Sequence, residues 1–436
     1  MKRMWTNQPL DTWLGHSVIA LLLLAVASPG VHAAQEGSRD TQLQELLQEA
    51  AQNNPEIRAA GNELEAAQQR ISPAGALDDP MLEAGVVNAP LASQAFRRED
   101  MTMKMLGLSQ RFPYPGKRGL RQDVAAKDAE SASHAYQETV NRVARDVKAA
   151  YFELAFVIES SRLVEDNRQV LEQFLKISES RYAVGQGSQA DVLKAQVQLT
   201  RMEDELLGLG RERRTIEAQL VRELGRESES GLTAPAALRL PETALQFESF
   251  RESALTKRPQ LLGLKTLIDR SEKSLELARR DYYPDFDVKL SYGQRENMLD
   301  GMPRDDMVSL TVAINLPVWR ASKRDPGVAE AIAMRNQARD LYQSQLNEMS
   351  SQLRQQLARA EQSLNSANLY ETGIVPQARL AVESSLAAYR VNRVDFLTLL
   401  DSQMAVLEYQ IDYASALWNY NVALAEIEYL TGKELY

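Results

Sequence analysis

The chain has 436 residues, 44% of them hydrophobic and 25% charged, so we expect it to fold rather than stay disordered. It contains no cysteine, which excludes disulfides, thiolate metal sites, cysteine nucleophiles and a lipid carried on an N-terminal cysteine. Lys and Arg number 50 against 60 Asp and Glu. The net charge of −10 argues against nucleic-acid binding, because affinity for DNA or RNA comes from phosphate neutralisation.

The N-terminus has the pattern of an export signal. Two basic residues near the start precede an apolar run at residues 18–27, and residues 31–33 (VHA) fit the small-residue cleavage rule. We therefore predict a cleaved signal peptide over residues 1–33. The alternative, an uncleaved anchor helix, is disfavoured because the apolar run is too short to span about 30 Å of hydrocarbon. Cleavage leaves His134 as the single histidine, which argues against a catalytic triad or a histidine-rich metal centre.

The rest of the sequence contains an internal repeat, so that its two halves resemble each other. A shift of 204 residues aligns prolines and strand ends in three places: Pro55 with Pro259, Pro80 with Pro284, and Phe112-Pro113 with Leu316-Pro317. After a three-residue insertion near residues 320–326, a shift of 207 aligns Gly185 with Asn392. Gly and Asn adopt positive φ most readily, so both positions are predicted to end a helix in the same way. We place the first repeat at residues 34–230 and the second at 231–436.

Each half is predicted to contain long helices. Apolar residues recur at helical spacing over 42–71 and 247–280, and a coiled-coil-like apolar stripe runs from Val140 to Ile158. Residues 117–184 and 329–391 contain no proline except Pro376. An unbroken helix of that length measures about 95–100 Å. Helices of this length do not fit a compact globule of this size, so we expect an elongated assembly.

Each half also contains two predicted strands. They cover residues 81–88 and 101–112 in the first half and 284–292 and 306–316 in the second, where apolar and polar residues alternate most regularly. Their length and two-faced pattern suit the wall of an outer-membrane barrel; the alternative is a soluble sheet packed on a core. Four strands are too few to close a barrel in lipid, so several chains are predicted to share one.

These features resemble the TolC-type outer-membrane efflux channels. The resemblance rests on the double repeat, its proline openings, the segment LSQRFPYPGKR at 108–118 and the two Tyr-x-Val-Gly/Asn turns. It implies a mostly α-helical fold with a membrane β part. Three chains would share a twelve-stranded β-barrel continued by a periplasmic α-barrel, without cofactor or catalysis. The implied partners are a periplasmic adaptor and an inner-membrane pump of the RND type. The start of the long helix is similar to the CzcC-like and CusC-like heavy-metal branch.

The resemblance also implies positions at the periplasmic end. The adaptor-docking tips would fall on two short turns, Val184, Gly185, Gln186 and Val391, Asn392, Arg393. Plain helix-ending turns are the other interpretation, and both can hold. The aperture positions would be Asp191 in the first half, and Thr398 and Asp401 in the second. Three copies of Asp401 would form an acidic ring; a solvated helix carboxylate is the alternative. The family's arginine latch is replaced by Val394, and the adjacent Arg393 could substitute only if the turn is rotated.

Other functions are left open by the sequence. An organic-compound or type I secretion duct has the same architecture, and a periplasmic coiled-coil scaffold would keep the helices. Asp285 and Asp287 could serve an exported hydrolase, but no phosphate loop or nucleophile elbow accompanies them. Methionines at 101, 103 and 105, and again at 298, 302 and 307, could bind Cu(I), although a lipid-facing wall or a loop is their commoner place.

Overall fold

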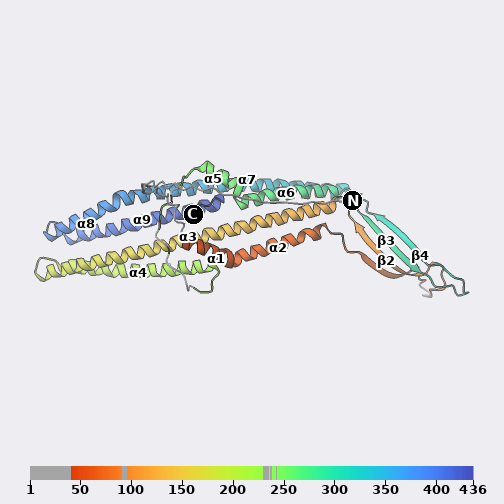
Figure 1. The fold of residues 1–436 in the computed structure, drawn as a ribbon, viewed down its shortest axis with the longest axis horizontal. Coiled ribbons are helices and arrows are strands. Elements are labelled where there is room, and N and C mark those ends of the chain that lie inside the picture. Colours follow the sequence, from red (N-terminus) through yellow and green to blue (C-terminus); the bar gives the residue numbers. More distant parts are fainter. Residues whose placement is uncertain (1–40, 91–95, 229–234, 236–237, 242, 436) are drawn as a thin grey trace, which may run out of the picture. The chain divides into compact units, whose positions relative to one another are not determined.

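Helices and a small sheet follow one another in two matching halves. The computed structural model describes residues 41–90, 96–228, 235, 238–241 and 243–435 (Figure 1). The predicted signal peptide at residues 1–33 lies outside this part of the chain. All described residues belong to one unit, Asp40–Tyr436.

The elements of the first half are α1 (Thr41–Asn53), α2 (Pro55–Gly75), β1 (Met81–Val87), β2 (Met103–Phe112), α3 (Lys117–Ala183) and α4 (Gln189–Leu224). Those of the second half are α5 (Phe247–Lys257), α6 (Pro259–Arg280), β3 (Phe286–Gln294), β4 (Met307–Ile314), the π-helical turns η1 (Arg320–Arg324) and η2 (Tyr370–Ile374), α7 (Asp325–Leu369), α8 (Val375–Arg390) and α9 (Phe396–Thr431).

The repeat seen in the sequence is present in the backbone. Pro55 and Pro259 each occupy the first position of a helix, α2 and α6, where the missing N–H of proline costs no hydrogen bond. Gly185 and Asn392 both adopt positive φ, 73° and 60°, directly after the caps of α3 and α8. The predicted equivalence of these positions is therefore confirmed.

The long first rod is confirmed, and the second continues as a helix that contains a π turn. Helix α3 runs for 67 residues, which corresponds to about 100 Å. The second rod was expected to continue from 329 to 391, and within it the π turn η2 joins α7 to α8 just before Pro376. Proline has no N–H and its ring clashes with the carbonyl four residues earlier, and the wider turn accommodates both effects. In the described part of the chain, no helix is long and apolar enough to cross a membrane.

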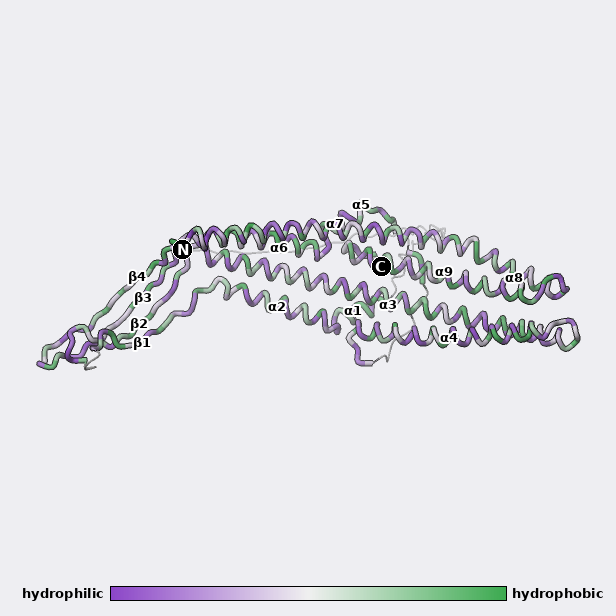
Figure 2. Tube along the Cα trace, turned by 180° about the vertical axis from the view of Figure 1, so that it is seen from behind, coloured by the Kyte–Doolittle hydropathy of each residue, from purple (hydrophilic) through white to green (hydrophobic). Residues whose placement is uncertain are grey.

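The four strands form one antiparallel sheet in the order β1-β2-β3-β4. Its central pairing, β2 with β3, joins the two halves of the chain and places Leu108 opposite Leu290. Each half alone supplies only a two-stranded hairpin, which is marginal in isolation. The two halves therefore depend on each other for the sheet. Figure 2 shows hydrophobic and hydrophilic residues following one another along the strands and helices.

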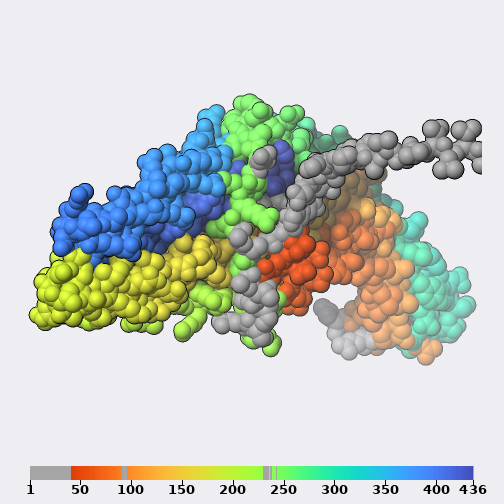
Figure 3. All heavy atoms as spheres, turned by 60° about the vertical axis from the view of Figure 1, so that its left-hand side comes forward, coloured from red at the N-terminus to blue at the C-terminus, as the bar shows by residue number. Residues whose placement is uncertain are grey.

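The helices pack as two hairpins, α3–α4 and α8–α9, in contact through α3 and α9 (Figure 3). The predicted apolar stripe of α3 supplies the core: Val143, Val147, Tyr151 and Leu154 are all buried. A second group of buried residues, including Phe174, Met202 and Leu399, lies between the hairpins.

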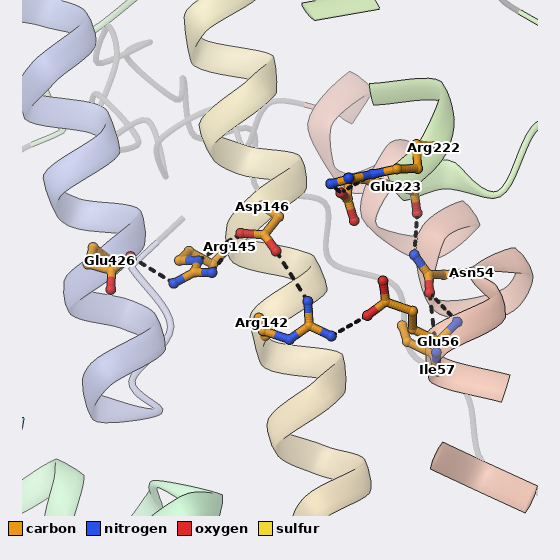
Figure 4. A network of polar contacts seen from close by, with 9 residues as sticks. All are labelled: Asn54, Glu56, Ile57, Arg142, Arg145, Asp146, Arg222, Glu223 and Glu426. Carbon is orange, nitrogen blue, oxygen red and sulfur yellow. Dashed lines mark hydrogen bonds and ion pairs between the residues drawn. The ribbon is translucent and has the colours of Figure 1, made fainter. Parts of the chain in front are cut away.

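A polar network connects the halves near the middle of α3 (Figure 4). Arg145 on α3 forms an ion pair with Glu426 on α9 at 3.3 Å, and Lys148 on α3 binds Glu428 on α9 at 2.6 Å. On the other side of α3, Arg142 pairs with Glu56 at the start of α2. Helix α3 is thus bonded on one side to its own half and on the other to the second half.

Candidate functional site

The two faces of the sheet differ in chemistry. Because directly paired residues point to the same face, the register assigns every strand residue to one of them. One face is mainly apolar, with Lys104, Gln110 and Gln294 as its polar members. Its large apolar side chains are exposed: Leu82, Val86, Leu106, Leu108, Leu290, Tyr292, Val308, Leu310, Val312 and Ile314. Val308 and Leu310 are 71% and 70% exposed. An exposed apolar face of this extent requires a lipid or protein partner.

The opposite face is polar and more enclosed. Glu83 on β1 forms an ion pair with Lys289 on β3 across Gly107, and Ser291 is only 9% exposed. The face also carries Ser109, Arg111, Asp287, Ser309 and Thr311. The surroundings of Asp285 and Asp287 add no support to the interpretation as an exported hydrolase. Asp287 pairs in register with Arg111, and Asp285 lies outside the strand in an anchoring role.

Asp285 anchors the junction between strands and helices. Its carboxylate accepts hydrogen bonds from the Lys117 Nζ at 2.9 Å and from the backbone N–H of Tyr114 at 2.9 Å. Burial alone would raise the pKa of Asp285, but these bonds and the Arg111 charge hold the pKa below its ordinary value. Lys117 is 3% exposed and also binds the carbonyl of Tyr283 at 3.1 Å. The start of α3 is thereby fixed to the segment that joins α6 to β3 at the base of the sheet.

The predicted docking positions lie at the ends of the two helical hairpins. Val184 and Val391 are 68% and 63% exposed, and Gln186 and Arg393 are exposed beside them. The two turns have the same hydrogen bonds: the N–H of Gln186 donates to the Arg181 carbonyl, and the N–H of Arg393 donates to the Ala388 carbonyl, at 2.8 and 2.9 Å. This is the glycine-type helix end expected of a residue at positive φ.

Arg181 ties the two tips together, and the sequence reasoning missed it. Its guanidinium donates to the carbonyl of Tyr389 at 2.6 Å and to the side-chain oxygen of Asn392, and it lies 4.5 Å from the centre of the Tyr389 ring. A cavity of about 570 Å³ lies between the tips beside these residues. One signal was available: under the 207-residue shift, Arg181 aligns with Ala388, so only one half carries the arginine.

The three predicted aperture residues have different surroundings. Asp191 belongs to a capping box with Ser188 at the start of α4. Thr398 donates its N–H and hydroxyl to Asp395, at 2.9 and 2.6 Å, and these bonds lower the pKa of Asp395. Asp401 is exposed on α9, one turn after Thr398 and on the same face. The structure thus brings Thr398 and Asp401 together and leaves Asp191 on the other hairpin as a capping residue.

Val394, which takes the place of the arginine latch, and the strand methionines are the remaining candidate positions. Val394 packs against the apolar cluster between the hairpins, and the exposed Arg393 follows the turn. Within the described ranges, no group of three or more His, Asp or Glu side chains could hold a metal ion. Met103, Met105 and Met307 lie on the polar face of the sheet rather than on the apolar one.

Comparison with known proteins decides the family. The model of the outer membrane efflux protein family matches residues 46–226 and 250–433, which is most of the chain. The chain belongs to the outer membrane efflux protein family. As a member it resides in the outer membrane, extends into the periplasm, and acts as an exit duct for efflux. The family and its fold are those of channels, not of enzymes.

Individual relatives agree with this placement. The chain is 22% identical over 409 residues to the cobalt-zinc-cadmium resistance protein CzcC of Cupriavidus metallidurans, covering 92% of each chain. Among solved structures, the outer membrane protein VceC of Vibrio cholerae has a TM-score of 0.77 at 19% identity, covering 91% of this chain and 97% of that one. A CusC structure has a TM-score of 0.77 at 15% identity, covering 91% and 93%. The predicted long helices with four strands per chain are the fold of these channels.

Proposed function

We propose that this protein works as a homotrimer, in which three four-stranded sheets close one barrel and the helical hairpins form the periplasmic duct. The observation that carries the proposal is the sheet itself. The outer edges of its strands β1 and β4 pair with no strand in the described part of the chain, and its outer face is apolar and exposed. In lipid, unpaired backbone groups at a sheet edge are strongly unfavourable, so further copies must supply the missing pairing.

The partners in this proposal are a periplasmic adaptor, which docks on the tips around Gly185 and Asn392, and an inner-membrane pump of the RND type that supplies the energy. Heavy-metal cations are the proposed cargo. Support comes from the likeness to CzcC, a resistance protein for cobalt, zinc and cadmium, which extends over 92% of both chains. A scaffold protein is less well supported, because it would leave the apolar sheet face without a partner.

The trimer and its pore are tested on the purified outer-membrane protein. We expect chemical cross-linking to stop at three copies, migration in SDS gels to change on heating, and reconstituted protein to conduct ions across planar bilayers. A monomer that never conducts would refute the proposed duct.

The proposed acidic ring of Asp401 is tested separately. Asp401→Asn removes three charges per trimer, so we expect lower cation selectivity and weaker block by divalent cations. Asp204→Asn is the matched control, because Asp204 is an exposed carboxylate on the other hairpin, on α4. Equal selectivity in Asp401→Asn and the unaltered protein would remove the ring from the model and leave the duct intact.

A further inference from the structure

The polar face of the sheet contains three methionines that gather around one glycine. Met105 on β2 and Met307 on β4 are the direct neighbours of Gly293 on β3. The Sδ of Met103 lies 2.5 Å from the place where a Cβ on Gly293 would be. The Met103 sulfur therefore lies above a residue that has no side chain, and Met105 and Met307 flank that residue on the same face.

Glycines and methionines alternate across the four strands in one row of the sheet. The register gives one row, Gly85, Met105, Gly293 and Met307, from β1 to β4. A Cβ on Gly85 would meet nothing within 4 Å. Open space is therefore found above Gly85, whereas the space above Gly293 is occupied by the Met103 sulfur.

The three methionines lie among polar groups. Lipid-facing residues of a membrane barrel are mainly apolar and interior-facing residues are mainly polar. This sheet follows that rule with exceptions on both faces, such as Lys104 on the outer face and Val87 on the inner one. Leu108 and Leu310 are 50% and 70% exposed on the outer face, whereas the Glu83–Lys289 ion pair lies on the inner face, in the two rows next to that of Met105 and Met307. The three thioethers therefore lie on the face that carries this ion pair, where a cation in the interior could reach them.

The repeat adds an independent observation. A shift of 204 residues places Met103 on Met307, so both halves of the chain carry a thioether at the same strand position. In the sheet these two positions lie on opposite sides of Gly293. Duplication has therefore placed two equivalent thioethers on the two strands that flank β3.

We propose that Met103, Met105 and Met307 form a binding site for soft monovalent cations, Cu(I) or Ag(I), on the interior face of the channel. Thioethers are soft, uncharged ligands that favour Cu(I) over Zn²⁺ and over hard cations. The site is weak enough to release its ion, because a thioether contributes no charge. This inference rests on the proposed duct, since it takes the polar face of the sheet as the interior.

The test measures Ag(I) binding to the full protein, because Ag(I) is stable in air. Isothermal titration calorimetry in chloride-free buffer is combined with X-ray absorption at the silver edge. We expect one Ag(I) per protomer with sulfur neighbours, and no binding of Zn²⁺ at this site. The variant Met103→Leu/Met105→Leu/Met307→Leu keeps the volume and removes the sulfur, and we expect its Kd to rise by about 100-fold or more.

Two further variants make the result specific. Met334→Leu/Met349→Leu/Met404→Leu removes three thioethers from helices α7 and α9, and we expect it to bind Ag(I) within about twofold of the unaltered protein. Gly293→Ala keeps all the sulfur atoms but fills the space occupied by the Met103 sulfur, so we expect at least tenfold weaker binding.

The outcomes separate the site from the duct. Absence of Ag(I) binding in the unaltered protein, or undiminished binding in the triple sheet variant, overturns the site. Equal loss in the helical variant overturns it too. If bilayer conductance is normal in those cases, the duct stands without the site. If the protein does not trimerise or conduct, the duct itself has failed.

Discussion

Breaking the Lys117–Asp285 contact should destabilise the junction between sheet and helices by a measurable amount. Lys117→Met leaves the carboxylate of Asp285, which is 9% exposed, without the ammonium that lay 2.9 Å away. Removing one partner of a buried ion pair costs about 3–5 kcal/mol. Asp285 retains the Tyr114 N–H and Arg111 at 3.5 Å, so we expect the lower end, about 3 kcal/mol.

A double-mutant cycle isolates the interaction. Asp285→Asn keeps an acceptor for Tyr114 and leaves Lys117 bonded to the Tyr283 carbonyl and to Asp281 at 3.4 Å, so we expect a cost of about 2 kcal/mol. The double variant removes both charges and should cost about 3 kcal/mol, which gives a coupling of about 2 kcal/mol. The assay is guanidinium unfolding of the detergent-solubilised protein. Costs that add within about 0.5 kcal/mol would refute the reasoning.

The same pair predicts a dependence on pH. The folded-state pKa of Asp285 is lowered, so its contribution to stability is complete above the unfolded pKa and is lost as the pH falls through the lower folded pKa. The stability difference between the unaltered protein and Lys117→Met should therefore be constant from pH 7 to about pH 5 and shrink below about pH 4. A difference that is unchanged at pH 2.5 would show that the ion pair is not its source.

Three other changes have defined outcomes in the folded protein. Asn54→Ala should lower the free energy of unfolding by about 2 kcal/mol, because the Asn54 side chain caps α2 and donates to the Glu223 carbonyl at 2.8 Å. Asn54→Asp keeps the cap, so it should recover about half of that lost stability in the same unfolding assay. Gly225→Ala should cost more than about 2 kcal/mol because φ is 68° and the new Cβ would lie 2.5 Å from the Asn53 carbonyl oxygen, whereas Gly208→Ala, in open space on α4, should be neutral or stabilising. Arg181→Ala should speed amide hydrogen exchange at both tips, residues 181–187 and 389–394, while Arg393→Ala should not; equal exchange in Arg181→Ala and the unaltered protein would contradict the bridging role.

What the sequence predicted follows from backbone requirements. Proline at the first turn of a helix, and glycine or asparagine at positive φ, restrict the backbone locally, so Pro55, Pro259, Gly185 and Asn392 could be recognised without the fold. The length of α3 followed from uninterrupted helical spacing. The irregularity at Pro376 was visible as a proline, but its form, a π turn, depends on how the chain compensates for the missing bond.

What the sequence left open depends on pairing between distant segments. The first-half strands alternate weakly, so the face of Met103 and Met105 could not be assigned until β2 was paired with the regular strand β3. Arg181 has the same limitation, because its partner Tyr389 is 208 residues away. The aperture residues were chosen by resemblance, and that reasoning carried no information about the capping bonds of Asp191 and Thr398.

The duplicated halves differ mainly where a side chain has a task that only one half performs. Three aligned pairs illustrate this: Asn54 with Arg258, Arg181 with Ala388, and Lys194 with Asp401. Asn54 caps α2 with its own side chain, whereas the start of α6 is satisfied by Glu138 of α3, which accepts from the Gln260 N–H at 3.2 Å. Two backbone positions have stayed alike, because Gly185 with Asn392 and Gly225 with Gly432 keep positive φ in both halves. Because the sheet and the hairpin contacts join unlike halves, each half can specialise while the other keeps the shared geometry. Among the three asymmetric pairs, Asn54 serves folding through its cap, whereas Asp401 is the position where mutation should alter conduction.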